Sequence, residues 1–368
     1  MNVQLSTQST LKFARWVWIT PIVGLSLIFA AGLYSDRSLL AQNPIYLVTE
    51  LTSGDATQVP SKINNLGVIV GRKAGEGKGA PRAAFWNHSQ PKGKHLGALA
   101  GADYSSATGI NDTGVITGAS NTKVAILPFI WTESNGLEQL PVLLGDTCGQ
   151  AVAINKNGYI AAYSSGSNGT RAFVWSRNSG ARDLGVLAGG KYSKARDLND
   201  SNEVVGISGS PNGDRAVLWT SNGSARDLGT LPGDFTSEAM AINNAGDVVG
   251  YSKGPKGMRA FLWTRSGGME AIGVLPGGSS SRALAINDSG TVIGTSVTAS
   301  GDRAFVWKRQ TGMLDLNDAV SLDPGIVLVE AHAINRKGDI LAMGTLDHSG
   351  MTECAPAAPF SFLLTPVQ

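Results

Sequence analysis

A tandem repeat of about 44 residues is the feature that most constrains the fold of this chain. Six tryptophans recur at spacings of 45, 44, 44, 44 and 44 residues: Trp86, Trp131, Trp175, Trp219, Trp263 and Trp307. Seven asparagines recur at spacings of 47, 44, 44, 44, 44 and 48 residues: Asn64, Asn111, Asn155, Asn199, Asn243, Asn287 and Asn335. Since the two markers are different residue types with one period, they indicate repeated structural units.

One unit of the repeat contains four short apolar runs separated by turn residues. The runs are Ser237–Asn243, Asp247–Ser252, Arg259–Trp263 and Met269–Leu275. Gly, Pro, Asn and Ser between the runs favour tight turns, so the pattern predicts four strands. Four strands in about 44 residues are typical of one blade of a β-propeller.

Counting the strands predicts how the ring closes. The first and second strand types each occur seven times, and Pro359–Leu364 supplies a seventh third strand. The seventh outer strand is Tyr46–Leu51, which precedes the first inner strand. We therefore predict an all-β fold: a seven-bladed β-propeller with four antiparallel strands per blade, closed by the N-terminal strand. A β-solenoid is the alternative, but it would not need this exchange of strands.

The N-terminus carries a hydrophobic export segment. Lys12 and Arg15 precede an uncharged apolar run from Trp16 to Tyr34. Residues 1–41 are therefore a signal peptide, cleaved after Ala41, or an uncleaved N-terminal membrane anchor. Residues 42–368 form the propeller in either case, and we expect it to be extracellular or periplasmic.

The charge of the chain excludes some partners. The net charge is +2, but residues 42–368 hold 27 basic and 27 acidic residues. A neutral body has no electrostatic attraction for nucleic acid or anionic lipid. We expect a monomer that meets a membrane only through the N-terminal segment, if that segment is uncleaved.

The repeat resembles the HAF-repeat family of extracellular proteins over about residues 46–364. The motifs that carry the resemblance are AMAINNAGDVVG, RAFLW and RDLGTLPG. Arg stands where the family has its eponymous His, at Arg82, Arg171, Arg215, Arg259 and Arg303. The resemblance implies an exported repeat protein and implies no activity or catalytic residue.

Motifs that could carry chemistry are weak. Ser252 lies in a Gly-x-Ser-x-Gly pattern, but Ser120, Ser208 and Ser296 occupy the same repeat position without the second Gly. The four histidines lack metal-ligand spacing. We expect no enzyme activity, no catalytic residue and no cofactor. Calcium at the Asn-x-x-Gly turns remains an alternative, although a turn Asn bonding its own backbone explains them.

Other recurrent residues have structural interpretations. The six tryptophans are predicted to pack between blades. The repeated Arg is predicted to pair with Asp183, Asp227 or Asp315 on the adjacent strand. Export makes a Cys148–Cys354 disulfide possible, and free thiols are the alternative.

Function is expected where the repeat varies, on the face formed by the blade-to-blade loops. The candidate binding residues there are Asp103, Tyr104, Lys191, Tyr192, Asp234 and Phe235. Insertions at Leu322–Val329 and Leu346–Ala358 fall on the same face. We predict a non-catalytic module that binds a protein or glycan at the cell surface.

Two alternatives remain open. The chain could be a structural surface or matrix protein, or an enzyme acting on polysaccharide. The inner strands are expected to offer mainly Ser, Ala and Asn to the channel. Several carboxylates converging there would favour the enzyme.

Overall fold

Blade 5 shows how one repeat folds. The computed structural model describes residues 45–52, 58–75, 79–87, 89–346 and 360–367. Blade 5 is an antiparallel meander whose strands are β18 (Thr236–Ile242), β19 (Val248–Gly254), β20 (Gly257–Thr264) and β21 (Gly268–Gly273). The turn between β18 and β19 requires Gly246, because its φ of +85° is a conformation that side chains disfavour. The four predicted strands are confirmed.

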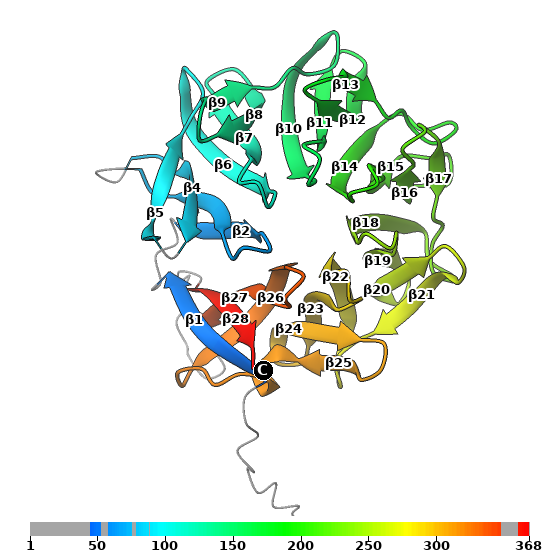
Figure 1. The fold of residues 1–368 in the computed structure, drawn as a ribbon. Helices are drawn as coiled ribbons and strands as arrows, with labels where there is room; N and C mark the ends of the chain where they lie inside the picture. Colours follow the sequence, from blue (N-terminus) through cyan, green and yellow to red (C-terminus); the bar gives the residue numbers. More distant parts are fainter. Residues whose placement is uncertain (1–44, 53–57, 76–78, 88, 347–359, 368) are drawn as a thin grey trace, which may run out of the picture. The chain divides into compact units, whose positions relative to one another are not determined.

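The same meander recurs around the ring (Figure 1). Blade 1 contains β2 (Val59–Ile63), β3 (Ile69–Lys73), β4 (Arg82–Asn87) and β5 (Gln90–Gly97). Blade 2 contains β6 (Ala102–Ile110), β7 (Ile116–Thr122), β8 (Ile126–Thr132) and β9 (Gly136–Gln139). Blade 3 contains β10 (Asp146–Ile154), β11 (Ile160–Gly166), β12 (Gly169–Ser176) and β13 (Gly180–Asp183).

Blades 4 and 6 follow the same order. Blade 4 contains β14 (Ser193–Leu198), β15 (Val204–Ser208), β16 (Arg215–Trp219) and β17 (Ala225–Asp227). Blade 6 contains β22 (Ser280–Ile286), β23 (Val292–Thr298), β24 (Gly301–Lys308) and β25 (Gly312–Asp315).

Blade 7 is closed by the N-terminal strand. Its sheet has the order β1-β28-β27-β26, and its strands are β26 (Ile326–Ile334), β27 (Ile340–Leu346), β28 (Phe360–Pro366) and β1 (Tyr46–Thr52). Antiparallel pairing aligns Tyr46 with Pro366. The predicted count of seven blades and the predicted closure are both confirmed. The strand expected at Pro359–Leu364 is Phe360–Pro366.

The hydrophobic core lies between neighbouring blades. In one cluster, Leu218 of blade 4 packs with Ala239, Phe261 and Trp263 of blade 5. Small residues on the inner strand and large ones on the third strand let the blades approach closely near the axis. Four of the six repeat tryptophans are buried, namely Trp86, Trp219, Trp263 and Trp307. Trp131 and Trp175 are half-buried.

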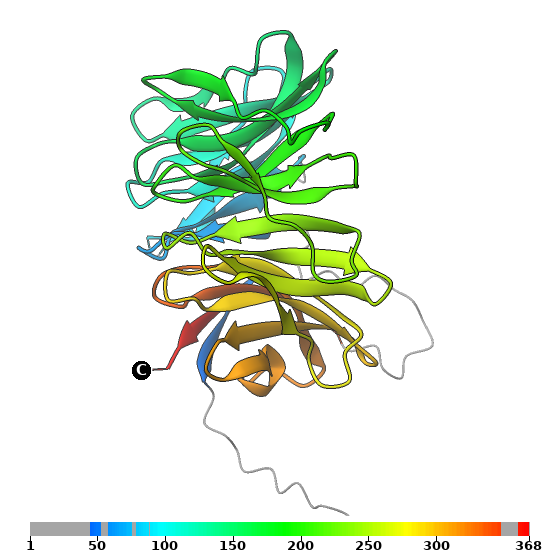
Figure 2. The same cartoon turned by 90° about the vertical axis from the view of Figure 1, so that its right-hand side faces the viewer.

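The meander places its connections at two ends of the ring, which Figure 2 shows from the side. We call one end the Asn end; it holds the turns at Asn64, Asn111, Asn155, Asn199, Asn243, Asn287 and Asn335, each between a first and a second strand. We call the other end the loop end. It holds the loops between second and third strands and the loops between blades.

The two insertions near blade 7 differ in what the structure shows. Leu328, within the Leu322–Val329 insertion, is fully buried in the core between blades 6 and 7. The side-chain amide of Asn317, in the short 3-10 helix η2 (Leu316–Asp318), bonds both backbone groups of Leu328. This insertion therefore packs as part of the fold. In the other insertion, Leu346–Ala358, everything beyond Leu346 lies outside the described residues.

Several predictions concern residues that the structure does not describe. The export segment and its cleavage after Ala41 lie outside the described residues. Cys354 does as well, and half-buried Cys148 forms no disulfide with any residue that the structure describes. In the described part of the chain, no helix is long and apolar enough to cross a membrane.

Candidate functional site

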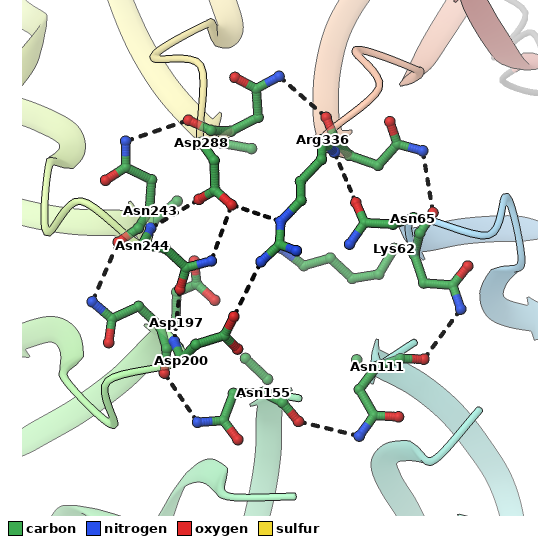
Figure 3. A pocket seen from close by; sticks show the side chains of 18 of the residues that line it. Lys62, Asn65, Asn111, Asn155, Asp197, Asp200, Asn243, Asn244, Asp288 and Arg336 are labelled. Atoms are coloured by element: carbon green, nitrogen blue, oxygen red, sulfur yellow. Dashed lines mark hydrogen bonds and ion pairs between the residues drawn. The ribbon is translucent and has the colours of Figure 1, made fainter. Parts of the chain in front are cut away.

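Seven asparagine side chains form a closed ring of hydrogen bonds at the Asn end (Figure 3). The Nδ2 of each repeat Asn donates to the backbone oxygen of the Asn in the next blade, at 3.0–3.3 Å. The last bond runs from Asn335 to Asn64 and joins blade 7 to blade 1. Within its own turn, Asn155 Oδ1 accepts from the backbone of Asn157 and Tyr159. The local role is as predicted, but sequence reasoning missed the bond between blades.

The residue after each ring Asn forms a second, interrupted ring. Its backbone N–H donates to the side-chain oxygen of the corresponding residue in the next blade. Five of these seven links exist, donated by Asn65, Lys156, Asp200, Asn244 and Arg336. The other two would need an acceptor on Lys156 or Arg336, and neither side chain has one. The two cations therefore break the second ring.

Arg336 instead crosses the mouth of the ring (Figure 3). Its guanidinium bonds to Asp288 at 2.6 Å and to Asp200 at 3.1 Å. Lys156 adds an ion pair with Asp200 at 3.5 Å. Although burial opposes it, hydrogen bonds from Asn244 and Arg336 hold the pKa of Asp288 below its usual value. These charges at the mouth compensate one another.

Inside this mouth lies a cavity of about 230 Å³, lined by the ends of all seven inner strands. At the position two residues before the ring Asn, five blades carry a small residue: Gly109, Ala153, Ala241, Ala285 and Ala333. Blade 1 carries Lys62 there, and blade 4 carries Asp197. Asp197 accepts the backbone N–H of Ile242 at 3.1 Å. Burial raises the pKa of Asp197, and Lys62 opposes that shift.

Further from the Asn end, the inner strands of blades 4 to 7 carry charged side chains. Glu238 accepts from Arg196 Nε at 2.6 Å and from the Tyr251 hydroxyl at 2.5 Å. Arg282 and Glu330 form an ion pair at 4.0 Å. The expectation that the inner strands present mainly Ser, Ala and Asn is therefore wrong for these blades.

Burial shifts the ionisation of this second group of residues. Burial and the hydrogen bond to Glu238 raise the pKa of Tyr251 to about 12. Burial also raises the pKa of Glu330. His332 Nε2 donates to the backbone oxygen of Pro60 at 3.2 Å, which leaves its buried Nδ1 without a hydrogen-bond partner. Burial and the charge of Lys62 lower the pKa of His332 to about 4, so this histidine is neutral at pH 7.

The six predicted binding residues all lie at the loop end, but they are not equivalent. Asp103, Lys191 and Phe235 are exposed, whereas Tyr104 and Tyr192 are half-buried. The two tyrosines occupy one register position, seven residues before the ring Asn, and blade 3 has Cys148 there. The sixth residue, Asp234, is different because its side chain is 1 % exposed and pairs with Arg259 at 2.6 Å. It is a structural residue of blade 5.

Exposed apolar side chains also lie at the loop end, and of these sequence reasoning named Phe235 but missed Leu144 and Val124. Leu144 is fully exposed, Val124 is 94 % exposed and Phe235 is 63 % exposed. Each stands on a different loop, in blades 2 to 5. At the Asn end, exposed large apolar side chains include Leu66, at 66 %, and Ile45 and Val367 beside the closing strand. An alignment of the seven repeats would have shown apolar residues at these loop positions.

The remaining motifs are structural. Ser252 is fully buried, and its hydroxyl accepts the backbone N–H of Leu231 from the preceding blade at 3.0 Å. Ser208 and Ser296 make the same bond. Arg171 pairs with Asp183, and Arg215 pairs with Asp227, as predicted. Among the described residues, no group of three or more His, Cys, Asp or Glu could hold a metal ion.

This architecture defines a seven-bladed β-propeller with a polar cavity at one end and varied loops at the other. The sequence matches no protein-family model and no curated protein, so membership of the HAF-repeat family stays a prediction. Known structures share the fold. Virginiamycin B lyase from Staphylococcus aureus is 12 % identical, with a TM-score of 0.52 over 88 % of this chain and 99 % of that one.

A second similar structure is the β-propeller domain of the Trilobed protease from Pyrococcus furiosus. It is 10 % identical, with a TM-score of 0.55 over 83 % of this chain and 92 % of that one. That domain is described as having an open velcro topology, whereas β1 closes the ring here. At such low identity, both comparisons show the fold alone.

Proposed function

We propose that this chain is an exported, non-catalytic β-propeller that binds a protein partner through its loop end. The contrast between the two ends supports this proposal. At the Asn end, polar groups bond one another around the ring. At the loop end, apolar side chains such as Val124, Leu144 and Phe235 face solvent. Exposed apolar residues on a rigid frame are typical of interaction surfaces.

The spread of these residues favours a protein over a glycan. The exposed apolar residues and the half-buried Tyr104 and Tyr192 come from blades 2 to 5. A partner that contacts several loops at once must cover a wide surface, on the order of 800 Å² per partner. Aromatic residues are also enriched in protein interfaces. A glycan bound at the same end is the alternative.

Export rests on residues 1–41, whose apolar run and basic start are those of a signal peptide or an anchor. The proposed site of action is therefore extracellular or periplasmic. We propose no cofactor for binding.

A polysaccharide-acting enzyme is the second candidate, because the inner strands of blades 5 and 7 carry carboxylates. Glu238 is held by Arg196 and Tyr251, and Glu330 lies beside Arg282. General acid–base catalysis needs a free acid and base facing one bond. The partners of these two acids are the reason for ranking binding first.

The test compares matched exposed residues at the two ends. Residues 42–368 are used as bait for extracellular proteins by crosslinking and on a glycan array, with the variants Leu144→Asp, Val124→Asp and Phe235→Asp. The control is Leu66→Asp at the Asn end, where the apolar side chain is 66 % exposed, close to the 63 % of Phe235. Each loop-end variant should lower capture of a specific protein about tenfold, while the control stays within about twofold.

Three outcomes would contradict the proposal. Equal loss in Leu66→Asp would show that capture does not depend on the loop end. Capture of glycan alone would favour the glycan alternative. Capture of nothing would favour a structural protein. Unchanged melting temperatures establish that the variants are folded.

A further inference from the structure

The cavity at the Asn end contains two charges that the repeat does not need. Five of seven blades place Gly or Ala two residues before the ring Asn, and this suffices to build the turn. Lys62 and Asp197 replace that small residue in blades 1 and 4. These blades are three apart in a ring of seven, so the two side chains enter the cavity from nearly opposite sides. Figure 3 shows the Lys62 side chain extending from blade 1 toward the middle of the ring.

The two charges are not an ion pair. No contact within 4.0 Å joins the Lys62 ammonium to the Asp197 carboxylate or to another carboxylate of the described residues. Asp197 has backbone partners in Ile242 and Leu198 but no cation within that distance. Lys62 is nevertheless close enough to oppose the shift in the pKa of Asp197. Both residues line the cavity without contacting each other.

The charges around the mouth behave differently. Arg336 and Lys156 bond Asp200, Arg336 also bonds Asp288, and Asp112 accepts two hydrogen bonds from Asn65. Each of these charged groups therefore has a hydrogen-bond or ion-pair partner within the protein. Both Lys62 and Asp197 are half-buried, and burial desolvates the Asp197 carboxylate. Placing these charges in the cavity without pairing them costs free energy, which Ala at both positions would avoid. A bound molecule that pairs with both would offset this cost.

The size and charge of the cavity define that molecule. A volume of about 230 Å³ corresponds to about eight water molecules at ~30 Å³ each, so a compact ligand fits. An anion would pair with Lys62 but would be repelled by Asp197. A cation would pair with Asp197 but would be repelled by Lys62. We propose that the cavity binds a small zwitterion, an aliphatic amino acid, with its carboxylate on Lys62 and its ammonium on Asp197. This site is separate from the partner surface proposed at the loop end.

The test uses probes that differ in charge separation and in charge number. Glycine, 4-aminobutanoate and 6-aminohexanoate are titrated calorimetrically into residues 42–368, beside pentanoate and pentylamine. At least one zwitterion should bind about tenfold more tightly than both singly charged probes. If pentanoate or pentylamine binds as tightly as the best zwitterion, or if no zwitterion binds, the proposal is wrong.

Variants then assign the two charges. Lys62→Ala and Asp197→Ala introduce the residue found in other blades, and each should weaken the binding of that zwitterion at least tenfold. The exchange Lys62→Asp with Asp197→Lys should restore most of the affinity, because the ligand can bind in the reversed orientation. Lys156→Ala, which removes a cation of the mouth, is the control and should change affinity less than threefold. Undiminished binding in both alanine variants, or no recovery in the exchange, would overturn the proposal.

Discussion

His332 is a residue whose ionisation is coupled to folding. It lies on β26, where its Nε2–H bonds Pro60 and its Nδ1 is buried beside the charge of Lys62. A proton on Nδ1 would find no acceptor there. This environment lowers the pKa of His332 from 6.5 to about 4 in the folded chain. Because the unfolded chain binds this proton more readily, the stability that the neutral ring contributes is complete above pH 6.5 and lost toward pH 4.

Replacing His332 should therefore flatten the acid side of the stability profile. We expect the wild type to lose up to about 3 kcal/mol of unfolding free energy through this group between pH 6.5 and 4. His332→Leu, which introduces the residue that blade 6 has at this register (Leu284), should lack this loss. Urea denaturation across this pH range measures it. Parallel profiles for the two proteins would contradict the assignment.

At the scale of single elements, the turn asparagine also connects neighbouring blades. Asn155 uses Oδ1 for its own turn and Nδ2 for the Asn199 backbone of the next blade. These roles are separable, because Asp keeps the acceptor but loses the donor. Asp is also well tolerated in turns. The two substitutions Asn→Asp and Asn→Ala thus distinguish a local from an interblade role.

We expect Asn155→Asp to destabilise the protein by about 2–4 kcal/mol, at least as much as Asn155→Ala. The reason is that a buried carboxylate would face the Asn199 carbonyl in place of a donor. Asn157→Ala removes an exposed hydrogen bond from the same turn and should cost less than about 1 kcal/mol. Chemical denaturation provides the values. A neutral Asn155→Asp variant would mean that the ring adds nothing beyond the turn.

A hydrogen bond that recurs between neighbouring blades loses its donor and its acceptor together at one interface. In four blade pairs, a serine of an inner strand accepts an alanine N–H from the third strand of the preceding blade, as Ser237 does from Ala216. Between blades 2 and 3, the equivalent residues are Gly149 and Pro128. Proline has no N–H and glycine has no hydroxyl, so donor and acceptor are missing together. Neither is left unsatisfied at this interface.

At the scale of the whole molecule, stability depends on ring closure. The outer strand of blade 7 comes from the other end of the chain, and Tyr46 at its start is buried in the core of blades 6 and 7. The ends of the propeller meet where the Val367 N–H bonds the Ile45 oxygen at 2.9 Å. Without β1, the edge of β28 and this core would be open to solvent.

Removing β1 should therefore destabilise the propeller, and attaching β1 at the other end of the chain should restore its stability. A chain that starts at Gln58 should lose at least about 3–5 kcal/mol relative to one that starts at Pro44, because a buried aromatic residue and a whole strand are lost. Joining residue 367 to Ile45 by a short Gly linker, so that the chain runs from Gln58 to Thr52, should restore stability. Thermal melts and gel filtration test both chains. Equal melting temperatures for the chains starting at Gln58 and Pro44 would contradict this role.

Much of the fold could be predicted because a blade is local. Within 44 residues, alternating apolar runs and turn residues such as Gly246 define four strands without reference to the rest of the chain. The strand count then required Tyr46–Leu51 to complete blade 7. The site was less predictable. The alternating direction of the strands placed the six proposed binding residues at the loop end. It did not show that Asp234 is buried against Arg259, because the sequence pattern gives no side-chain contacts.

The sequence alone therefore determined the strands and the turns, because hydrogen bonds between consecutive strands of a blade are short-range along the chain. Counting the strand types then gave the number of blades and the closing strand, whose partner β28 lies at the other end of the chain. Only the tertiary structure decided what meets at the axis. Lys62 and Asp197 are 135 residues apart, and each is a single departure from a small residue. They face one cavity because seven blades complete one turn of the ring, which is a property of the packing angle between blades.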